Sequence, residues 1–269
     1  HADTQYVARW EILRMIKYQF HAKEATGQCV EWIRSYFDEA GCDKAVVGIS
    51  GGKDSSVVAA LCVAALGKDR VLGVMMPQGR QPDIEDSRAL IKYLGIEGKT
   101  IHIGNPVGDI LDRMFDEGIT PSQQTQINLP ARIRMATLFA VAQSVNGRVA
   151  NTCNLSEDWI GYSTIFGDNA GQFAPIAQFT VQEVKEIGRV LGLPEYLIEK
   201  TPSDGLCGKS DEDNLGFSYA VLDRYIRIGI CEDIDIRIKI DQLHWNNLFK
   251  KDIVNIPCFH PTQTLFLAS

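Results

Sequence analysis

The sequence predicts a three-layer α/β/α protein built on a parallel, doubly wound sheet. Short apolar runs with β-branched residues alternate with amphipathic helical patterns through the first 150 residues or so, which is typical of right-handed strand–helix–strand crossovers. Glycines and small polar residues directly follow the first apolar run, at the edge where open parallel sheets bind ligands. The length of 269 residues suits one such domain, with a helical extension over about residues 1–25 and a tail over about 258–269.

Composition excludes several classes of protein. The formal net charge of −7 argues against nucleic-acid binding, which usually needs a basic surface. No apolar run approaches the roughly 20 residues of a membrane span, and no signal peptide is visible. The seven cysteines are scattered without a Cys-x-x-Cys pair, as expected for buried thiols in a reducing compartment. We therefore expect a cytoplasmic protein with no nucleic-acid or membrane partner.

The first half of the predicted sheet follows from residue periodicity. Apolar residues at helical spacing predict helices over about residues 6–20 and 26–37. The apolar run 45–49 predicts the first strand, and the helical pattern of 57–66 lies behind it. A second buried strand is expected over 71–76.

The second half is punctuated by turn residues. A helix is expected over about 83–94 and a short strand over 100–103. After a loop rich in turn formers, a helix is predicted over about 129–145 and a fourth strand over 147–152. The Gly-rich, aromatic stretch 161–175 fits neither period and predicts a loop.

The junction of the first strand and its helix predicts a phosphate-binding loop. Residues 46–56 run Val-Val-Gly-Ile-Ser-Gly-Gly-Lys-Asp-Ser-Ser. Paired glycines let the backbone approach an anion, and the N–H groups of the first helical turn point at it. A Walker loop is excluded because Lys53 is followed by Asp54 and because Val47 stands where the first glycine belongs. A dinucleotide fingerprint is excluded because Gly-x-Gly-x-x-Gly is absent.

This loop resembles the Ser-Gly-Gly-x-Asp-Ser loop of the ATP pyrophosphatases. An acidic residue beside phosphates suits a bound cation, so the resemblance implies that Asp54 binds Mg²⁺ on the leaving pyrophosphate. The alternative is structural, because a carboxylate in the first turn of a helix is also favoured by the helix dipole.

Five further segments, in unbroken order, closely resemble NAD synthetases. They are Ala-Arg-Ile-Arg-Met at 131–135, Asn-Leu-Ser-Glu at 154–157, the loop 161–175, Pro-Ser-Asp-Gly-Leu at 202–206 and Asp-Glu-Asp-Asn-Leu-Gly at 211–216. The resemblance covers about residues 46–257. It implies the adenine nucleotide alpha hydrolase-like fold, a homodimer, and ATP-dependent amidation of deamido-NAD through an adenylated nicotinate, with release of AMP and pyrophosphate.

The resemblance also implies roles for individual residues. Asp54 and Asp168 are expected to be catalytic, and Asp54 and Glu157 to bind Mg²⁺. ATP is expected to contact Gly48, Ser50, Gly52, Lys53, Asp54, Ser55, Ser56, Met75, Gln81, Arg134, Thr152 and Ser203. Deamido-NAD is expected to contact Arg132, Tyr162, Phe166, Asp168, Lys250 and Lys251. The alternatives are a helix-start carboxylate for Glu157, packing or a dimer contact for the aromatic residues, and surface charges for the basic ones.

Three positions depart from the family's pattern. Met75 and Val181 stand where basic residues are common, so two cations near ATP are missing. Lys53, often an aliphatic residue in the family, is a candidate to compensate for them. On that hypothesis, Lys53→Ala raises the KM for ATP several-fold, and an unchanged KM would contradict it.

The expected nitrogen donor is free ammonia, because 269 residues leave no room for the amidase domain of glutamine-dependent relatives. A separate amidotransferase subunit stays open. Two other functions also stay open: an ATP pyrophosphatase that adenylates a different carboxylate or a base, and a module that binds ATP without turning it over.

Overall fold

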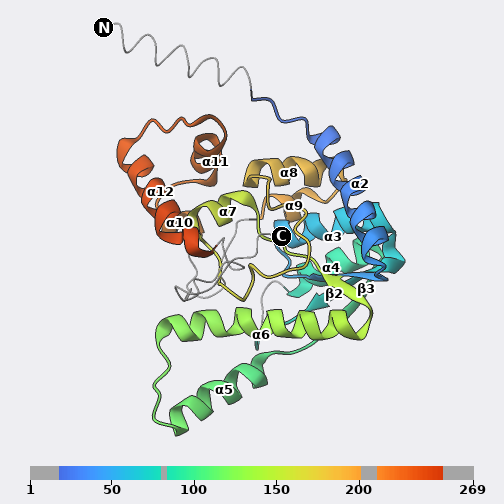
Figure 1. Ribbon diagram of the computed structural model, residues 1–269, viewed down its shortest axis with the longest axis vertical. Coiled ribbons are helices and arrows are strands. Elements are labelled where there is room, and N and C mark those ends of the chain that lie inside the picture. Colours follow the sequence, from blue (N-terminus) through green and yellow to red (C-terminus); the bar gives the residue numbers. More distant parts are fainter. Residues whose placement is uncertain (1–17, 80–83, 201–210, 251–269) are drawn as a thin grey trace, which may run out of the picture.

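The computed structural model describes residues 18–79, 84–200 and 211–250 (Figure 1). Within these residues, four parallel strands form one sheet in the order β3-β2-β1-β4. The strands are β1 (Lys44–Gly48), β2 (Val71–Met75), β3 (Glu97–Thr100) and β4 (Gly147–Val149). The strand order reverses between β1 and β4, which defines a doubly wound sheet and a crevice at its carboxyl edge.

Helices cover both faces of the sheet, which confirms the predicted three layers (Figure 1). The first helices are α2 (Ala22–Ala40), α3 (Lys53–Leu66), α4 (Ile84–Leu94), α5 (Gly104–Asp116) and α6 (Gln123–Ser144). The later ones are α7 (Leu155–Ile160), α8 (Val181–Val190), α9 (Glu195–Ile198), α10 (Asp211–Leu215), α11 (Tyr219–Ile228) and α12 (Ile234–Asn247). Short 3₁₀ turns lie at η1 (Lys68–Arg70) and η2 (Leu248–Lys250).

The two faces of the sheet bury alternate residues of β1. Ala45 and Val47 point into a core shared with α2, α3, α8 and α9. Val46 points to the opposite face, into a core shared with α5 and α6. Because successive side chains of a strand point to opposite faces, the unbroken apolar run of β1 is what a strand covered on both sides requires.

A third apolar cluster joins α7 to α8, α11 and α12. Its buried members include Ile160, Val181, Leu222 and Ile240. In Figure 1, α11 and α12 stand beside α7 at the end of the molecule away from α2. This cluster supports α7, which starts just after β4.

Three expectations about the elements were wrong in detail. The third strand covers Glu97–Thr100 rather than 100–103. It lies at the edge of the sheet and all four of its residues are exposed, so it has no apolar signal in the sequence. Helix α6 begins at Gln123 rather than near 129, because Ser122 caps it by accepting a bond from the Thr125 N–H at 3.1 Å and Pro130 lies inside the helix. The fourth strand ends at Val149 rather than 152, because only a single bridge, Ala150 to Phe173, continues it.

The expected N-terminal helix over 6–20 falls mostly outside the described residues, and residues 18–20 are not helical. Helix α5 was not predicted at all. The single-domain organisation with its extension and tail stays a prediction.

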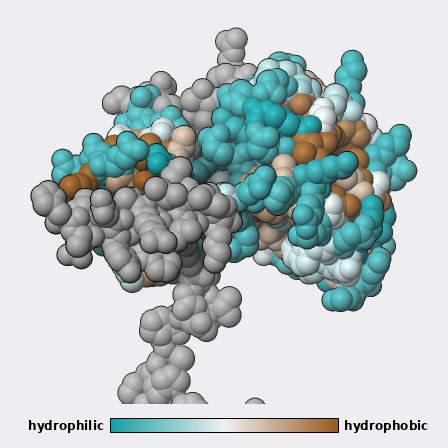
Figure 2. All heavy atoms as spheres, turned by 90° about the horizontal axis from the view of Figure 1, so that it is seen from above, coloured by the Kyte–Doolittle hydropathy of each residue, from teal (hydrophilic) through white to brown (hydrophobic). Residues whose placement is uncertain are grey.

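The face shown in Figure 2 carries hydrophilic side chains over much of its coloured surface, with small apolar groups between them. Among the described residues, no helix has the length and apolar character needed to cross a membrane.

Candidate active site

The predicted phosphate-binding loop connects β1 to α3. Gly51 has a φ of +82°, a conformation that favours glycine, and Gly52 precedes the first residue of α3 in an extended conformation. The exposed Ser50 Oγ accepts from the Gly52 N–H at 3.2 Å and lies 3.1 Å from Ser55 Oγ. Ser56 Oγ donates to the Gly52 carbonyl at 2.7 Å. The loop is therefore a compact turn with Ser50 on its open side, as a phosphate-binding loop needs.

The two predicted metal ligands meet because β1 and β4 are neighbours in the sheet. Asp54 lies in the first turn of α3 and Glu157 in the first turn of α7. Asn154 joins them: its Oδ1 accepts from the Glu157 N–H at 3.1 Å, and its Nδ2 donates to Asp54 Oδ1 at 3.0 Å. Oxygen ligands from two carboxylates, completed by substrate phosphates, are what Mg²⁺ takes in nucleotide sites. The residues present thus fit a magnesium ion.

Burial sets the electrostatics of this pair. It raises the pKa of Glu157, Asp54 raises it further, and Lys53 opposes the shift. Burial alone lowers the pKa of Lys53, but Asp54 and Glu157 outweigh it and the pKa is raised. Across the described part of the chain, no three His, Cys, Asp or Glu side chains are grouped to hold a metal by themselves.

The two arginines of α6 reach different parts of the carboxyl edge. Arg134 Nε donates to the Met76 carbonyl just after β2, at 3.2 Å. Arg132 Nε donates to the Ile165 carbonyl in the loop 161–175, at 3.3 Å. Burial lowers the pKa of Arg134, and the Asp168 carboxylate opposes that shift. A largely buried guanidinium bound to one carbonyl keeps donors for an anionic ligand.

The first half of the loop 161–175 is held by hydrogen bonds with Asp168 and Lys250. Asp168 Oδ1 accepts from the Thr164 N–H at 2.7 Å, and the rest of the Asp168 side chain is exposed. Lys250 Nζ donates to the carbonyls of Gly161 and Ser163 at 2.6 and 3.0 Å. Burial lowers the pKa of Lys250, against the attraction of Asp168. Lys250, expected to bind deamido-NAD, is thus bonded to the backbone of this loop.

The remaining predicted residues are less closely gathered. Met75 packs into the core between the sheet and α3, and Gly48 faces Leu138 of α6. Thr152 follows β4 half-buried, and Phe166 is exposed. Tyr162 Oη donates to Asp211 Oδ1 at 3.2 Å. Gln81, Ser203 and Lys251 lie outside the described residues.

Two residues of the site have no role in the sequence-based prediction. Asn154 bonds both Asp54 and Glu157. The sequence signal that could have identified it is an asparagine directly before a helix, which is typical of an N-terminal helix cap. Tyr219 of α11 turns its ring toward Lys53, whose Nζ lies 5.9 Å from the ring centroid. The Tyr219 hydroxyl is buried and has no hydrogen-bond partner among the described residues. No local pattern identifies Tyr219, because 166 residues of chain separate it from Lys53.

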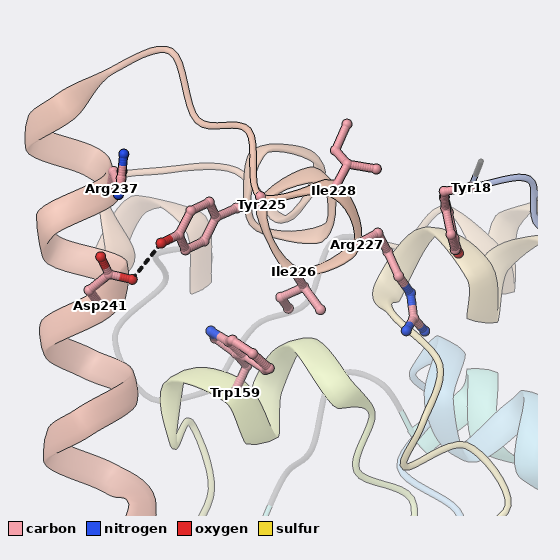
Figure 3. A pocket seen from close by; sticks show the side chains of 9 residues that line it. Tyr18, Trp159, Tyr225, Ile226, Arg227, Ile228, Arg237 and Asp241 are labelled. Carbon is pink, nitrogen blue, oxygen red and sulfur yellow. Dashed lines mark hydrogen bonds between the residues drawn. The ribbon is translucent and has the colours of Figure 1, made fainter. Parts of the chain in front are cut away.

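A cavity of about 670 Å³ lies among α7, α11 and α12 (Figure 3). Trp159, Tyr225 and Arg237 face into it, and Tyr225 Oη donates to Asp241 Oδ1 at 2.7 Å. None of the residues predicted to bind ATP or deamido-NAD lines it. The candidate active site therefore stays at the carboxyl edge of the sheet.

Comparison with sequences of known proteins identifies the family of the chain. The family model described as NAD synthase matches residues 25–255. A relative from Methanosarcina acetivorans named NH(3)-dependent NAD(+) synthetase is 42% identical, covering 77% of this chain and 82% of its own. Another of the same name, from Pyrococcus furiosus, is 41% identical over 67% of this chain and 70% of its own.

Solved structures agree with the sequences. The structure of NMN synthetase from Francisella tularensis has a TM-score of 0.82 and 31% identity, covering 90% of this chain and all of that one. The NH3-dependent NAD synthetase from Campylobacter jejuni has a TM-score of 0.71 and 27% identity, also covering 90% of this chain and all of that one. The shared fold is the adenine nucleotide alpha hydrolase-like fold. With a family match over most of its length and relatives above 40% identity, the chain belongs to the NAD synthase family.

Proposed function

We propose that the protein is an ammonia-dependent NAD synthetase, a ligase that forms a carbon–nitrogen bond. The observation that carries the proposal is the meeting of Asp54 and Glu157 beside the loop that precedes α3. A phosphate-binding loop with two carboxylates at one edge suits a reaction on ATP that releases pyrophosphate. The names of the relatives from Methanosarcina and Pyrococcus supply the product, NAD, and the nitrogen donor, ammonia.

The reaction has two steps. A nicotinate carboxylate oxygen of deamido-NAD attacks the α-phosphorus of ATP, and the bond from that phosphorus to the pyrophosphate oxygen breaks. The lone pair of ammonia then attacks the carboxyl carbon, the carbon–oxygen bond to AMP breaks, and the nitrogen loses a proton. Adenylation is needed because a free carboxylate is a poor electrophile.

Residues of this chain position the two anionic substrates. Ser50 and the N–H groups at the start of α3 hold the pyrophosphate end of ATP. Arg134 lies where it offers donors to substrate phosphate, and Asp168 orients the nicotinate end of deamido-NAD. Holding two reactants in line contributes much of the rate of such a reaction.

Asp54 and Glu157 are proposed to bind Mg²⁺. When bound, the ion neutralises the charge that develops on the leaving pyrophosphate. The support for this assignment is the pair of half-buried carboxylates and Asn154, which bonds the Asp54 carboxylate and the Glu157 N–H.

One assay tests the proposal. Purified protein is mixed with deamido-NAD, ATP, Mg²⁺ and ammonium, and NAD and pyrophosphate are measured together. We expect both to form in equal amounts. ATP binding without NAD formation would instead favour a nucleotide-binding module, and adenylation of another acid would favour a different ATP pyrophosphatase.

A second acceptor, nicotinate mononucleotide, is supported by one observation. The Francisella NMN synthetase has a higher TM-score and identity to this chain than the Campylobacter NAD synthetase. The same assay, run with the mononucleotide and with deamido-NAD, gives a kcat/KM for each. The larger kcat/KM identifies the physiological acceptor. We expect deamido-NAD to give the larger value, because the relative that is 42% identical to this chain is named an NAD(+) synthetase.

A homodimer is proposed through α5 and α6. The second face of the sheet is covered by these helices, yet Ile110, Phe115, Ile119 and Ile127 stay exposed on or beside them. Phe115 keeps 71% of its surface exposed. An apolar set of this kind, outside a core that is already closed, fits a second copy of the same chain.

The proposed compartment is the cytoplasm. Five cysteines in the described ranges, including the buried Cys29, Cys62 and Cys153, are free thiols. Free thiols of this kind fit a reducing compartment.

A further inference from the structure

Lys53 is a buried ammonium at the start of a helix. Its side chain is 2% exposed, and it is the first residue of α3. The amino end of a helix carries a partial positive charge, so a cation there is disfavoured unless an anion compensates for it. A buried lysine at this position therefore requires nearby anions that offset its charge.

The compensation comes from both predicted metal ligands. Lys53 Nζ lies 2.8 Å from Asp54 Oδ2 and 4.0 Å from Glu157 Oε1. These carboxylates are themselves 18% and 16% exposed. A single ammonium thus stands within ion-pair distance of two carboxylates that otherwise repel each other in a site shielded from water.

Other groups complete the surroundings of the ammonium. The Tyr219 ring, 5.9 Å away, offers a π face to a cation. Asp211, at the start of α10, adds a third attractive charge. Val181, the first residue of α8, is uncharged and buried in the same apolar cluster as Tyr219. The cation beside Tyr219 is therefore Lys53 of α3.

We propose that Lys53 is a built-in counter-ion. Its ammonium neutralises the Asp54–Glu157 pair when no divalent metal is bound, and it is displaced from these carboxylates when a divalent metal binds. This inference rests on the metal ligands of the proposed function. The ammonium and the metal compete because both are cations that need the same carboxylate oxygens. It follows that the free enzyme binds divalent metal weakly and that the metal enters together with the nucleotide, whose phosphates supply further ligands.

Metal affinity of the nucleotide-free protein tests the inference. Mn²⁺ serves as the probe, and its free concentration is followed by electron paramagnetic resonance. In Lys53→Met, which keeps the length of the side chain and removes its charge, we expect Mn²⁺ to bind at least about tenfold more tightly than in the wild type. Lys53→Arg, which keeps the charge, is expected to bind Mn²⁺ as weakly as the wild type.

Lys44→Met is the matched control. Lys44 also pairs with a carboxylate, Glu97, at 2.7 Å, but on the surface and away from the site. Its Mn²⁺ affinity is expected to equal that of the wild type. Equal or weaker Mn²⁺ binding in Lys53→Met would overturn the inference.

Loss of folding in Lys53→Met also decides the question. If the variant is unfolded in EDTA but folds on addition of Mn²⁺, metal and ammonium are interchangeable and the inference stands. If Mn²⁺ does not restore its circular dichroism spectrum, Lys53 has a purely structural role and the inference fails.

A further pair of variants separates this inference from the proposed function. Glu157→Gln should remove the gain in Mn²⁺ affinity when combined with Lys53→Met. Persistence of the gain in the double variant would refute Glu157 as a ligand, and with it the competition. NAD formation by the wild type is measured separately, so the activity can hold while the counter-ion role fails.

Discussion

Side chains at the carboxyl edge of the sheet are held by groups from distant elements. Arg134 of α6 bonds a carbonyl that follows β2, and Arg132 bonds a carbonyl of the loop 161–175. Their spacing of two residues turns them in different directions on the helix. Each arginine therefore serves a different part of the site.

Glutamine variants of the two arginines should separate the two substrates. Arg134→Gln is expected to raise the KM for ATP by about tenfold or more, because a charge-assisted contact with phosphate is lost. Arg132→Gln should mainly raise the KM for deamido-NAD. Steady-state kinetics with each substrate varied in turn provide the measurement. Equal effects of both variants on both constants would contradict the division.

Asp54→Asn should remove turnover while the fold stays intact. The amide has the shape of the carboxylate but not its charge, so the loss of rate is expected to be roughly 100-fold or more. NAD formation gives the activity, and circular dichroism gives the fold. The matched control is Asp69→Asn, an exposed carboxylate in η1. Full activity in the Asp54 variant would refute the metal assignment.

Some contacts of the candidate site can be predicted from sequence motifs and others cannot. The pairing of Asp54 with Glu157 follows from two motifs and the position of their strands, and the structure places β1 beside β4 as that pairing requires. The direction of the Lys53 side chain does not follow from any motif. It depends on Tyr219 and Asp211, which only tertiary packing brings to the site.

Helix ends decide how the elements meet near the site. Gly161 ends α7 with a φ of +68°, and a Cβ there would lie 2.1 Å from Asn247 Cβ of α12. Gly41 ends α2 with a φ of +59° and open space around it. The two glycines share a conformation and differ in packing.

Alanine variants of these two glycines should separate the cost of left-handed backbone strain from the cost of a steric clash with a neighbouring helix. Gly41→Ala is expected to destabilise the fold by roughly 1–2 kcal/mol from left-handed backbone strain alone. Gly161→Ala should cost about 3 kcal/mol or more, because α7 and α12 must also separate. Urea unfolding measures both. Equal losses would show that the Asn247 contact yields at no cost.

A buried cap should be worth more than an exposed one. Asp223 of α11 accepts from the Gln182 N–H at the start of α8 at 2.8 Å and from Ser156 Oγ of α7 at 2.5 Å. We expect Asp223→Ala to destabilise by about 3 kcal/mol, since buried donors lose their acceptor. Asp233→Ala, at the exposed cap of α12, should cost about 1 kcal/mol. Similar losses in thermal unfolding would contradict the role of burial.

The burial of each strand or helix explains most of the errors in the predicted secondary structure. Strands β1 and β2 were found because both are buried and therefore apolar. Strand β3 was misplaced because no side chain in it is buried, and α5 was missed although it is strongly one-sided, with Val107 as its fully buried residue. Leu111 of α5 packs against the same core, whereas Ile110 and Phe115 are exposed.

The two faces of the sheet are covered differently across the molecule. The core around α3 is continuous and buried. The layer of α5 and α6 covers the opposite face of the sheet with Pro130 and Ala142 as the fully buried residues of a 22-residue helix. Such a layer is stabilised when another copy packs on it.

A charge in this layer should dissociate the proposed dimer. Phe115→Glu is expected to shift the protein from dimer to monomer in sedimentation velocity experiments, because burying an unpaired carboxylate is costly. The control is Ile234→Glu, at an equally exposed position of α12. A wild type that sediments as a monomer at all concentrations would refute the dimer, and a variant that stays dimeric would refute this interface.

The strand order also determines when the site can come into being. The hydrogen bond from Asn154 to Asp54 joins residues 100 positions apart, and β4 comes last along the chain among the four described strands. While the protein is being synthesised, β1 can pair with β2 early, but its other edge stays bare until residue 147 has left the ribosome. A bare central strand is an open template for pairing with another chain, and contacts between distant residues form slowly. The pairing of β1 with β4, which brings Asp54 and Asn154 together, thus also leaves one side of β1 open to misassembly during synthesis.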